Sequence, residues 1–137
     1  MAESVIEERP SWILAVNRNQ DLLGKTILVL RRDCTAVVDI DGEEWVRLHC
    51  ELQRLVPVLD RLFRPDQVNF AFLMNVDAQV HLHVVPRYSS PRRWHGMDFA
   101  DAHWGTAFGH EQRHLEPSEL ATLAGEVREQ LTLGSAS

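Results

Sequence analysis

At 137 residues the chain has the length of one domain, long enough to bury roughly two thirds of the surface that its unfolded form exposes. Its composition of 45% hydrophobic and 25% charged residues is that of a globular protein and argues against disorder or a fibre. The formal net charge of −6 argues against extended nucleic acid as a partner, because only a local basic patch would attract a polyanion. We therefore expect one domain over residues 1–137.

Cysteine usage and hydropathy indicate a reducing compartment. Cys34 and Cys50 are the only cysteines, and they show neither a Cys-x-x-Cys pair nor the spacing of a disulfide framework. The N-terminal MAESVIEERP is acidic, and no segment approaches the ~18 uninterrupted apolar residues of a membrane span. We expect a cytoplasmic protein without membrane contact.

The first elements along the chain are two neighbouring strands. SWILAV, 11–16, and KTILVL, 25–30, are short aliphatic runs separated by a polar segment that ends in Gly24. Asn17 falls where the first strand ends, and there its side chain either forms a turn or faces a ligand.

An amphipathic helix is predicted from Glu43 onward, because apolar residues recur every three or four positions on one stripe. Pro57 lies inside this stripe and has no N–H to donate, so we expect a kink or a break near Val56. The stripe consists of Trp45, Leu48, Leu52, Leu55, Leu59 and Leu62.

The next elements form an antiparallel hairpin. VNFAFLMN, 68–75, and QVHLHVV, 79–85, are strand-like, and the short VDA between them leaves no room for a parallel crossover. Residues 86–114 have no clear period and are interpreted as an ordered functional loop, whose aromatic residues either pack a satellite cluster or wall a ligand. Within this loop, Arg87 is expected to form an ion pair. The C-terminal stripe predicts a helix over about 117–131.

The strand at 79–85 carries the chemistry. Side chains alternate along a strand, so Gln79, His81 and His83 share one face while aliphatic residues anchor the other. A neutral imidazole is a nucleophile near pH 7, since its unperturbed pKa is about 6.5. With Nδ1–H on a backbone carbonyl, His81 could attack phosphorus through Nε2, while His83 contacts a phosphoryl oxygen or the leaving group.

The segment AQVHLHVVPRY, 78–88, resembles the signature of the histidine triad (HIT) family, His-φ-His-φ-His-φ-φ with φ hydrophobic. The order of the expected elements over about 11–115 also resembles small bacterial members. The resemblance implies an α+β fold, with an antiparallel sheet of about five strands packed with two helices, and usually a homodimer. It further implies a nucleotide hydrolase or nucleotidyl transferase that acts at the α-phosphate, for example of diadenosine polyphosphates, through a covalent nucleotidyl-histidine and without a metal or other cofactor.

The resemblance also assigns roles to single residues. His81 matches the nucleophile and His83 the third histidine, while Gln79 stands where the family has its first histidine. An amide cannot shuttle a proton, but it can position a neighbour, and we interpret Gln79 as a subgroup trait. The remaining matches are to substrate-binding positions, with Asn69 and Asn75 at the phosphate or leaving group and Asn17 at the ribose.

Two alternatives remain open. The substitution at Gln79 is compatible with a nucleotide-binding module that does not turn over. Histidines at i and i+2 of a strand can also ligate zinc if another side chain supplies a third ligand. The other histidines that could do so are His95, His103, His110 and His114.

Overall fold

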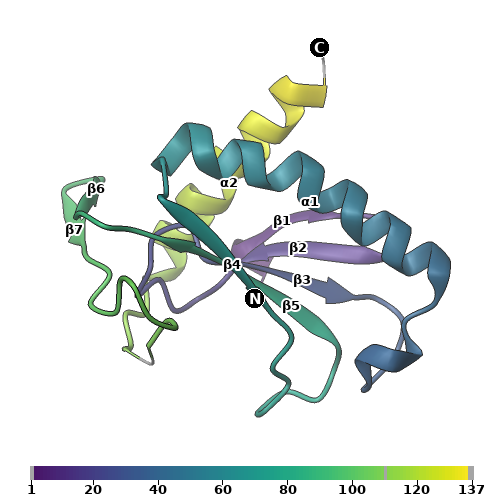
Figure 1. Cartoon of the computed structure of the whole chain (residues 1–137). Coiled ribbons are helices and arrows are strands. Elements are labelled where there is room, and N and C mark those ends of the chain that lie inside the picture. Colours follow the sequence, from purple (N-terminus) through teal and green to yellow (C-terminus); the bar gives the residue numbers. More distant parts are fainter. Residues whose placement is uncertain (1, 110, 136–137) are drawn as a thin grey trace.

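The computed structural model describes residues 2–109 and 111–135. A five-stranded antiparallel sheet, in the order β1-β2-β3-β5-β4, packs with two helices, as predicted (Figure 1). No helix of the described residues is long and apolar enough to cross a membrane. The sheet consists of β1 (Val5–Glu8), β2 (Trp12–Val16), β3 (Thr26–Leu30), β4 (Gln67–Ala71) and β5 (His81–Arg87); the helices are α1 (Gly42–Phe63) and α2 (Pro117–Ser135), with short 3-10 turns η1 (Ala2–Ser4) and η2 (Val37–Asp39).

One face of the sheet builds the core. Leu14, Leu28 and Leu82 lie opposite one another on β2, β3 and β5, and each is at most 3% exposed. They belong to the same buried cluster as Leu55 of α1 and Leu123 of α2. The helices therefore cover this face, and the alternate side chains of the same strands point to the other face.

Helix α1 runs without a break through Pro57, so of the kink or break expected near Val56 the break is wrong. Pro57 and Gln53, whose carbonyl Pro57 cannot bond, are both exposed, and water can hydrate that carbonyl. On the other side of the helix, Val58 and Leu59 are at most 1% exposed, and their packing holds the helix together.

The antiparallel hairpin of β4 and β5 is confirmed, but β4 is shorter than predicted and β5 begins and ends two residues later than predicted. β4 ends at Ala71 and β5 begins at His81, so residues 72–80 form the connection in place of the tight VDA turn. The backbone of Val80 pairs with Leu30, the last residue of β3, and with Cys34 after it, which draws this segment away from β4. Gln79 consequently lies outside the strand.

Two elements carry too weak a pattern to be predicted. Strand β1 buries only Ile6 and contains two glutamates. The hairpin of β6 (Arg92–Trp94) and β7 (Met97–Phe99) turns at His95 and Gly96, both with positive φ, which is typical of a two-residue hairpin turn. Trp94 and Phe99 of this hairpin are buried in the core cluster, which confirms their packing role.

Gly24, in the turn before β3, packs closely against the end of α1. Its φ of 88° lies in the left-handed region. A Cβ at this position would come within 2.8 Å of the Phe63 ring, so the backbone here passes closer to α1 than any side chain would allow.

Candidate functional site

His81 and His83 project from β5 on the face of the sheet opposite the helices, hereafter the histidine face. Their rings are half-buried, with centroids 4.8 Å apart and planes inclined by 70°. Between them Leu82 points into the core and is 3% exposed. The alternation predicted from the sequence is therefore confirmed for both histidines.

A cavity of about 380 Å³ opens against these two rings. Its volume lies at the lower end of the range for small-molecule sites. The wall facing the histidines comes from the connection between β4 and β5, including Asn75, which lies between the two strands in sequence. The cavity is lined by Leu73, Met74, Asn75, Val76, Asp77, His81 and His83.

The orientation of His81 is set by the backbone. Its Nδ1 lies 2.7 Å from the carbonyl oxygen of Gln79. A carbonyl oxygen only accepts hydrogen bonds, so Nδ1 carries the proton and the lone pair of the neutral ring is on Nε2. Residue 79 therefore positions His81 through its main chain.

The side chain of Gln79 has a different task. Its Nε2 donates to the carbonyl oxygens of Leu30, at 2.7 Å, and Arg32, at 2.8 Å, and its Oε1 accepts from the N–H of Cys34 at 3.1 Å. All three bonds go to the backbone at the end of β3 and just after it. The amide clamps this segment to the start of β5, and its hydrogen bonds are not directed at His81.

His83 is held neutral. Burial lowers its pKa to about 4, and the charges of His81 and Lys25 act in the same direction. At pH 7 the ring of His83 is therefore an uncharged hydrogen-bonding group.

The predicted site residues divide into two groups. His81, His83 and Asn75 line one cavity, and the side chain of Asn75 makes no hydrogen bond to any other residue that the structure describes. Asn17 lies outside it, directly after β2, where its Oδ1 accepts from the N–H of Asn19 at 2.9 Å. Asn69 lies on β4 opposite Val85.

Comparison with solved structures supports the fold, whereas comparison of sequences finds no match. No family model and no curated protein matches the chain. A histidine triad protein from Bradyrhizobium japonicum superimposes with a TM-score of 0.71 at 22% identity, over 95% of this chain and 92% of that one. The chain has the histidine triad fold.

Two further structures with the histidine triad fold are informative. A hypothetical histidine triad nucleotide-binding protein from Sulfolobus tokodaii has a TM-score of 0.72 at 11% identity, over 95% of this chain and 84% of that one. Diadenosine triphosphate hydrolase from Plasmodium falciparum has a TM-score of 0.71 at 15% identity, over 97% and 79%. At these identities the likeness concerns the fold alone.

Arg87 fixes the far end of β5 in this version of the histidine triad fold. It is 3% exposed, and all five of its N–H donors are used, including a bidentate pair with Asp101 at 2.7 and 3.2 Å. The others go to Oδ1 of Asn69 and the carbonyl oxygens of Thr106 and His103. The expected ion pair is confirmed, and Arg87 has no donor left for phosphate.

The Arg87 ion pair also sets the pKa of its partner. Burial alone would raise the pKa of Asp101, but bonds from Arg87 and from the N–H groups of Tyr88 and His103 hold it below its usual range.

The histidines outside the cavity are dispersed over the fold. His95 bonds Glu126 at 2.5 Å, His103 bonds Glu111 at 2.6 Å, and His114 bonds Gln112 at 2.8 Å. Over residues 2–109 and 111–135 no three histidine, cysteine or acidic side chains come together as a metal site. His110 lies outside the described residues, so the metal alternative has no ligand set in the described part of the chain.

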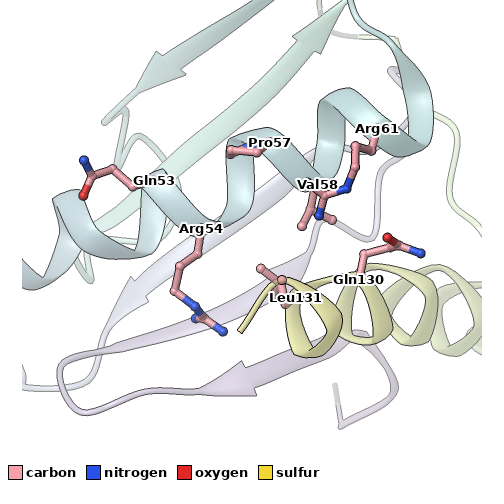
Figure 2. Close-up of a pocket in the computed structure, with 8 residues that line it drawn as sticks. Gln53, Arg54, Pro57, Val58, Arg61, Gln130 and Leu131 are labelled. Atoms are coloured by element: carbon pink, nitrogen blue, oxygen red, sulfur yellow. The ribbon is translucent and has the colours of Figure 1, made fainter. Parts of the chain in front are cut away.

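Another cavity, of about 360 Å³, lies between the helices, as Figure 2 shows. Arg54 and Arg61 from α1 face Gln130 and Leu131 from α2 across it, and Pro57 also lines it. It contains neither imidazole nor carboxylate, so nothing in its lining is suited to acid–base or nucleophilic chemistry.

The sequence did not reveal the outer wall of the histidine cavity. Leu73, Met74, Val76 and Asp77 lie in a connection without regular structure. The hydrophobic run that continues to Met74 resembled a strand. Met74 has a positive φ, and nothing in the sequence indicates this backbone conformation, because the residue is not a glycine.

Proposed function

We propose that this chain is a histidine triad family member that hydrolyses or transfers at the α-phosphate of nucleotide esters, anhydrides or phosphoramidates, such as diadenosine polyphosphates. One observation carries the proposal: His81 faces a cavity of ligand size with its Nδ1 proton bound to the Gln79 carbonyl. The nucleophilic nitrogen is thus preorganised. The two similar structures that are a nucleotide-binding protein and a diadenosine triphosphate hydrolase support the same substrate class.

In the proposed reaction, Nε2 of His81 attacks the α-phosphorus. The N–P bond forms while the bond from phosphorus to the leaving group breaks, and the leaving group takes the electron pair. Water then attacks the same phosphorus, the N–P bond breaks, and the proton of the water passes to solvent. Asn75 is the group beside the histidines that would donate to a phosphoryl oxygen. The scheme requires no metal or cofactor.

The state of His83 bears on the leaving group. With a pKa of about 4, its ring is a poor proton donor at pH 7. A leaving group that departs as a stable anion, such as a nucleoside polyphosphate, needs no proton from the protein. Anhydrides are therefore the substrates that this site would cleave fastest, ahead of phosphoramidates, whose amine must be protonated.

The histidine face also offers a surface for the nucleoside. Ile13, Ile27 and Val29 lie beside the histidines in the sheet register, and all are partly exposed. Asn17 ends this apolar row, and among the described residues its Nδ2 has no partner, so it remains the proposed contact for the ribose. Oδ1 of Asn69 accepts a hydrogen bond from Arg87, so in this proposal Asn69 helps to hold Arg87 at the end of β5 and does not contact the nucleotide directly.

We also propose a homodimer formed through the edge of the sheet. Within the described chain, β4 pairs only with β5, and its residues Gln67–Ala71 carry no charge. Phe70 is 49% and Leu73 43% exposed there, and Trp45 of α1, 40% exposed, packs edge-on against Phe72. An uncharged edge strand beside exposed apolar side chains favours pairing with a second copy. Sedimentation at micromolar concentration would show it, and a monomer that persists there contradicts the proposal.

The reaction is tested by trapping the intermediate. The protein is mixed with diadenosine triphosphate, quenched and weighed by mass spectrometry, and peptide mapping locates the modified residue. We expect an adenylyl group on His81 that is absent from His81→Ala and retained in His49→Ala, which changes an exposed histidine of α1. Calorimetric binding of AMP without adduct or product would instead support the module that binds without turnover.

A further inference from the structure

Lys25 is a buried cation on the histidine face. It precedes β3, and its carbonyl oxygen accepts from the N–H of Asn17 at 2.8 Å, which extends the pairing of β2 and β3 by one residue. Its neighbour Thr26 is 1% exposed and lies opposite Val84 on the core side. Alternation along the strand therefore directs Lys25 to the same face as His83.

The register places Lys25 between the two parts of the proposed nucleotide site. Asn17, directly after β2, is its direct neighbour across the pairing, and His83 is diagonal to it on β5, since Ile27 pairs with His83. Diagonal neighbours are about 7 Å apart at Cβ, within the reach of a lysine side chain. The charge of Lys25 does reach His83, because it contributes to lowering the pKa of that ring.

A single carboxylate holds this cation in place. Nζ of Lys25 lies 2.7 Å from Oδ1 of Asp21, and the two side chains are only 10% and 6% exposed. A buried charge pair of this kind needs a reason, because desolvation offsets much of its attraction. Asp21 lies in the turn before β3, so the ammonium of Lys25 is held by the same turn that leads into Lys25.

We propose that Lys25 determines specificity for a phosphorylated ligand, by supplying the fixed positive charge between the ribose position at Asn17 and the phosphate position at His83. The charge acts through space and favours an anionic nucleotide over the uncharged nucleoside that has the same base and ribose. This inference rests on the proposed nucleotide function. Within that function it assigns a role to Lys25, which the resemblance to the family did not single out.

The test compares two variants that both lack the Asp21 carboxylate, so that removing the ammonium leaves no buried carboxylate unpaired. Lys25→Met alone would leave the buried carboxylate of Asp21 without its cation. The informative pair is therefore Asp21→Asn and the double variant Asp21→Asn/Lys25→Met, which differ only at residue 25. Binding of AMP and of adenosine is measured by calorimetry after thermal melting has shown that both variants are folded. Relative to Asp21→Asn, in which no carboxylate balances the ammonium, the double variant is expected to bind AMP roughly tenfold more weakly, because it lacks the positive charge of residue 25. Adenosine binding should not change, and Asp21→Asn/Lys25→Arg should restore AMP binding.

Two results would overturn the inference while leaving the proposed function intact. One is equal AMP affinity in the two variants, given that the wild-type protein binds AMP. The other is a parallel loss of AMP and adenosine binding, which would mean that Lys25 only supports the structure. If the wild-type protein binds neither ligand, the nucleotide function itself is wrong, and the role of Lys25 is wrong with it.

Discussion

Replacing Gln79 with alanine separates the two tasks that meet at this position. The substitution removes three side-chain hydrogen bonds, to the carbonyls of Leu30 and Arg32 and from the N–H of Cys34. It leaves the main-chain carbonyl that accepts from His81. We therefore expect a loss of stability with retained chemistry.

The magnitude follows from the environment of the three bonds. Each net hydrogen bond contributes about 1 kcal/mol, which gives an upper figure of about 3 kcal/mol for the set. Gln79 is half-buried, so water replaces part of what is lost, and we expect the free energy of unfolding to fall by about 2 kcal/mol. Gln79→His should also lose stability, because one imidazole cannot replace two donors and an acceptor aimed at three backbone groups.

Urea denaturation followed by tryptophan fluorescence measures the stability, and adduct formation on His81 measures the chemistry. Gln53→Ala is the matched control, because Gln53 is an exposed glutamine on α1, and its replacement should change stability by less than about 0.5 kcal/mol. The reasoning is refuted if Gln79→Ala is as stable as Gln53→Ala and yet forms no adduct. That result would make the amide itself part of the reaction.

Two further predictions concern buried groups. Arg87→Met should lower the free energy of unfolding by about 3–5 kcal/mol, because the Asp101 carboxylate, 1% exposed, would lose its cation; a loss below about 1 kcal/mol in urea would contradict this. The ring of His83 should titrate near pH 4 in an NMR series rather than near 6.5. Since the unfolded chain takes up this proton at the higher pH, the folded state should lose stability as pH falls from about 6.5 to 4.

The sequence was sufficient to predict that His81 and His83 share one face of the sheet. Strand alternation depends on only a few neighbouring residues, and the buried Leu82 between two half-exposed histidines follows directly from it. The pairing of β2 with β3 and of β4 with β5 followed equally from short connections and apolar runs. These features are local, so one sequence contains them.

What the sequence could not supply depends on contacts between distant segments. The clamp by Gln79 joins residues 45 to 49 positions apart, and it also fixes where β5 begins. The partners of Arg87 lie 14 to 19 residues away in either direction along the chain. No periodicity encodes such pairs, because each arises from the way the segments pack. The break expected near Val56 is absent for the same reason, since packing of α1 holds the helix together despite the missing hydrogen bond.

Gly24 gives the site an unexpected point of sensitivity. The turn that leads into Lys25 passes Phe63 so closely that one added methyl group would displace either the turn or the last residue of α1. An alteration of the helix terminus would thus be transmitted to the histidine face through a residue without a side chain. A substitution at Phe63 would therefore affect the position of Lys25, although the two residues lie on different elements.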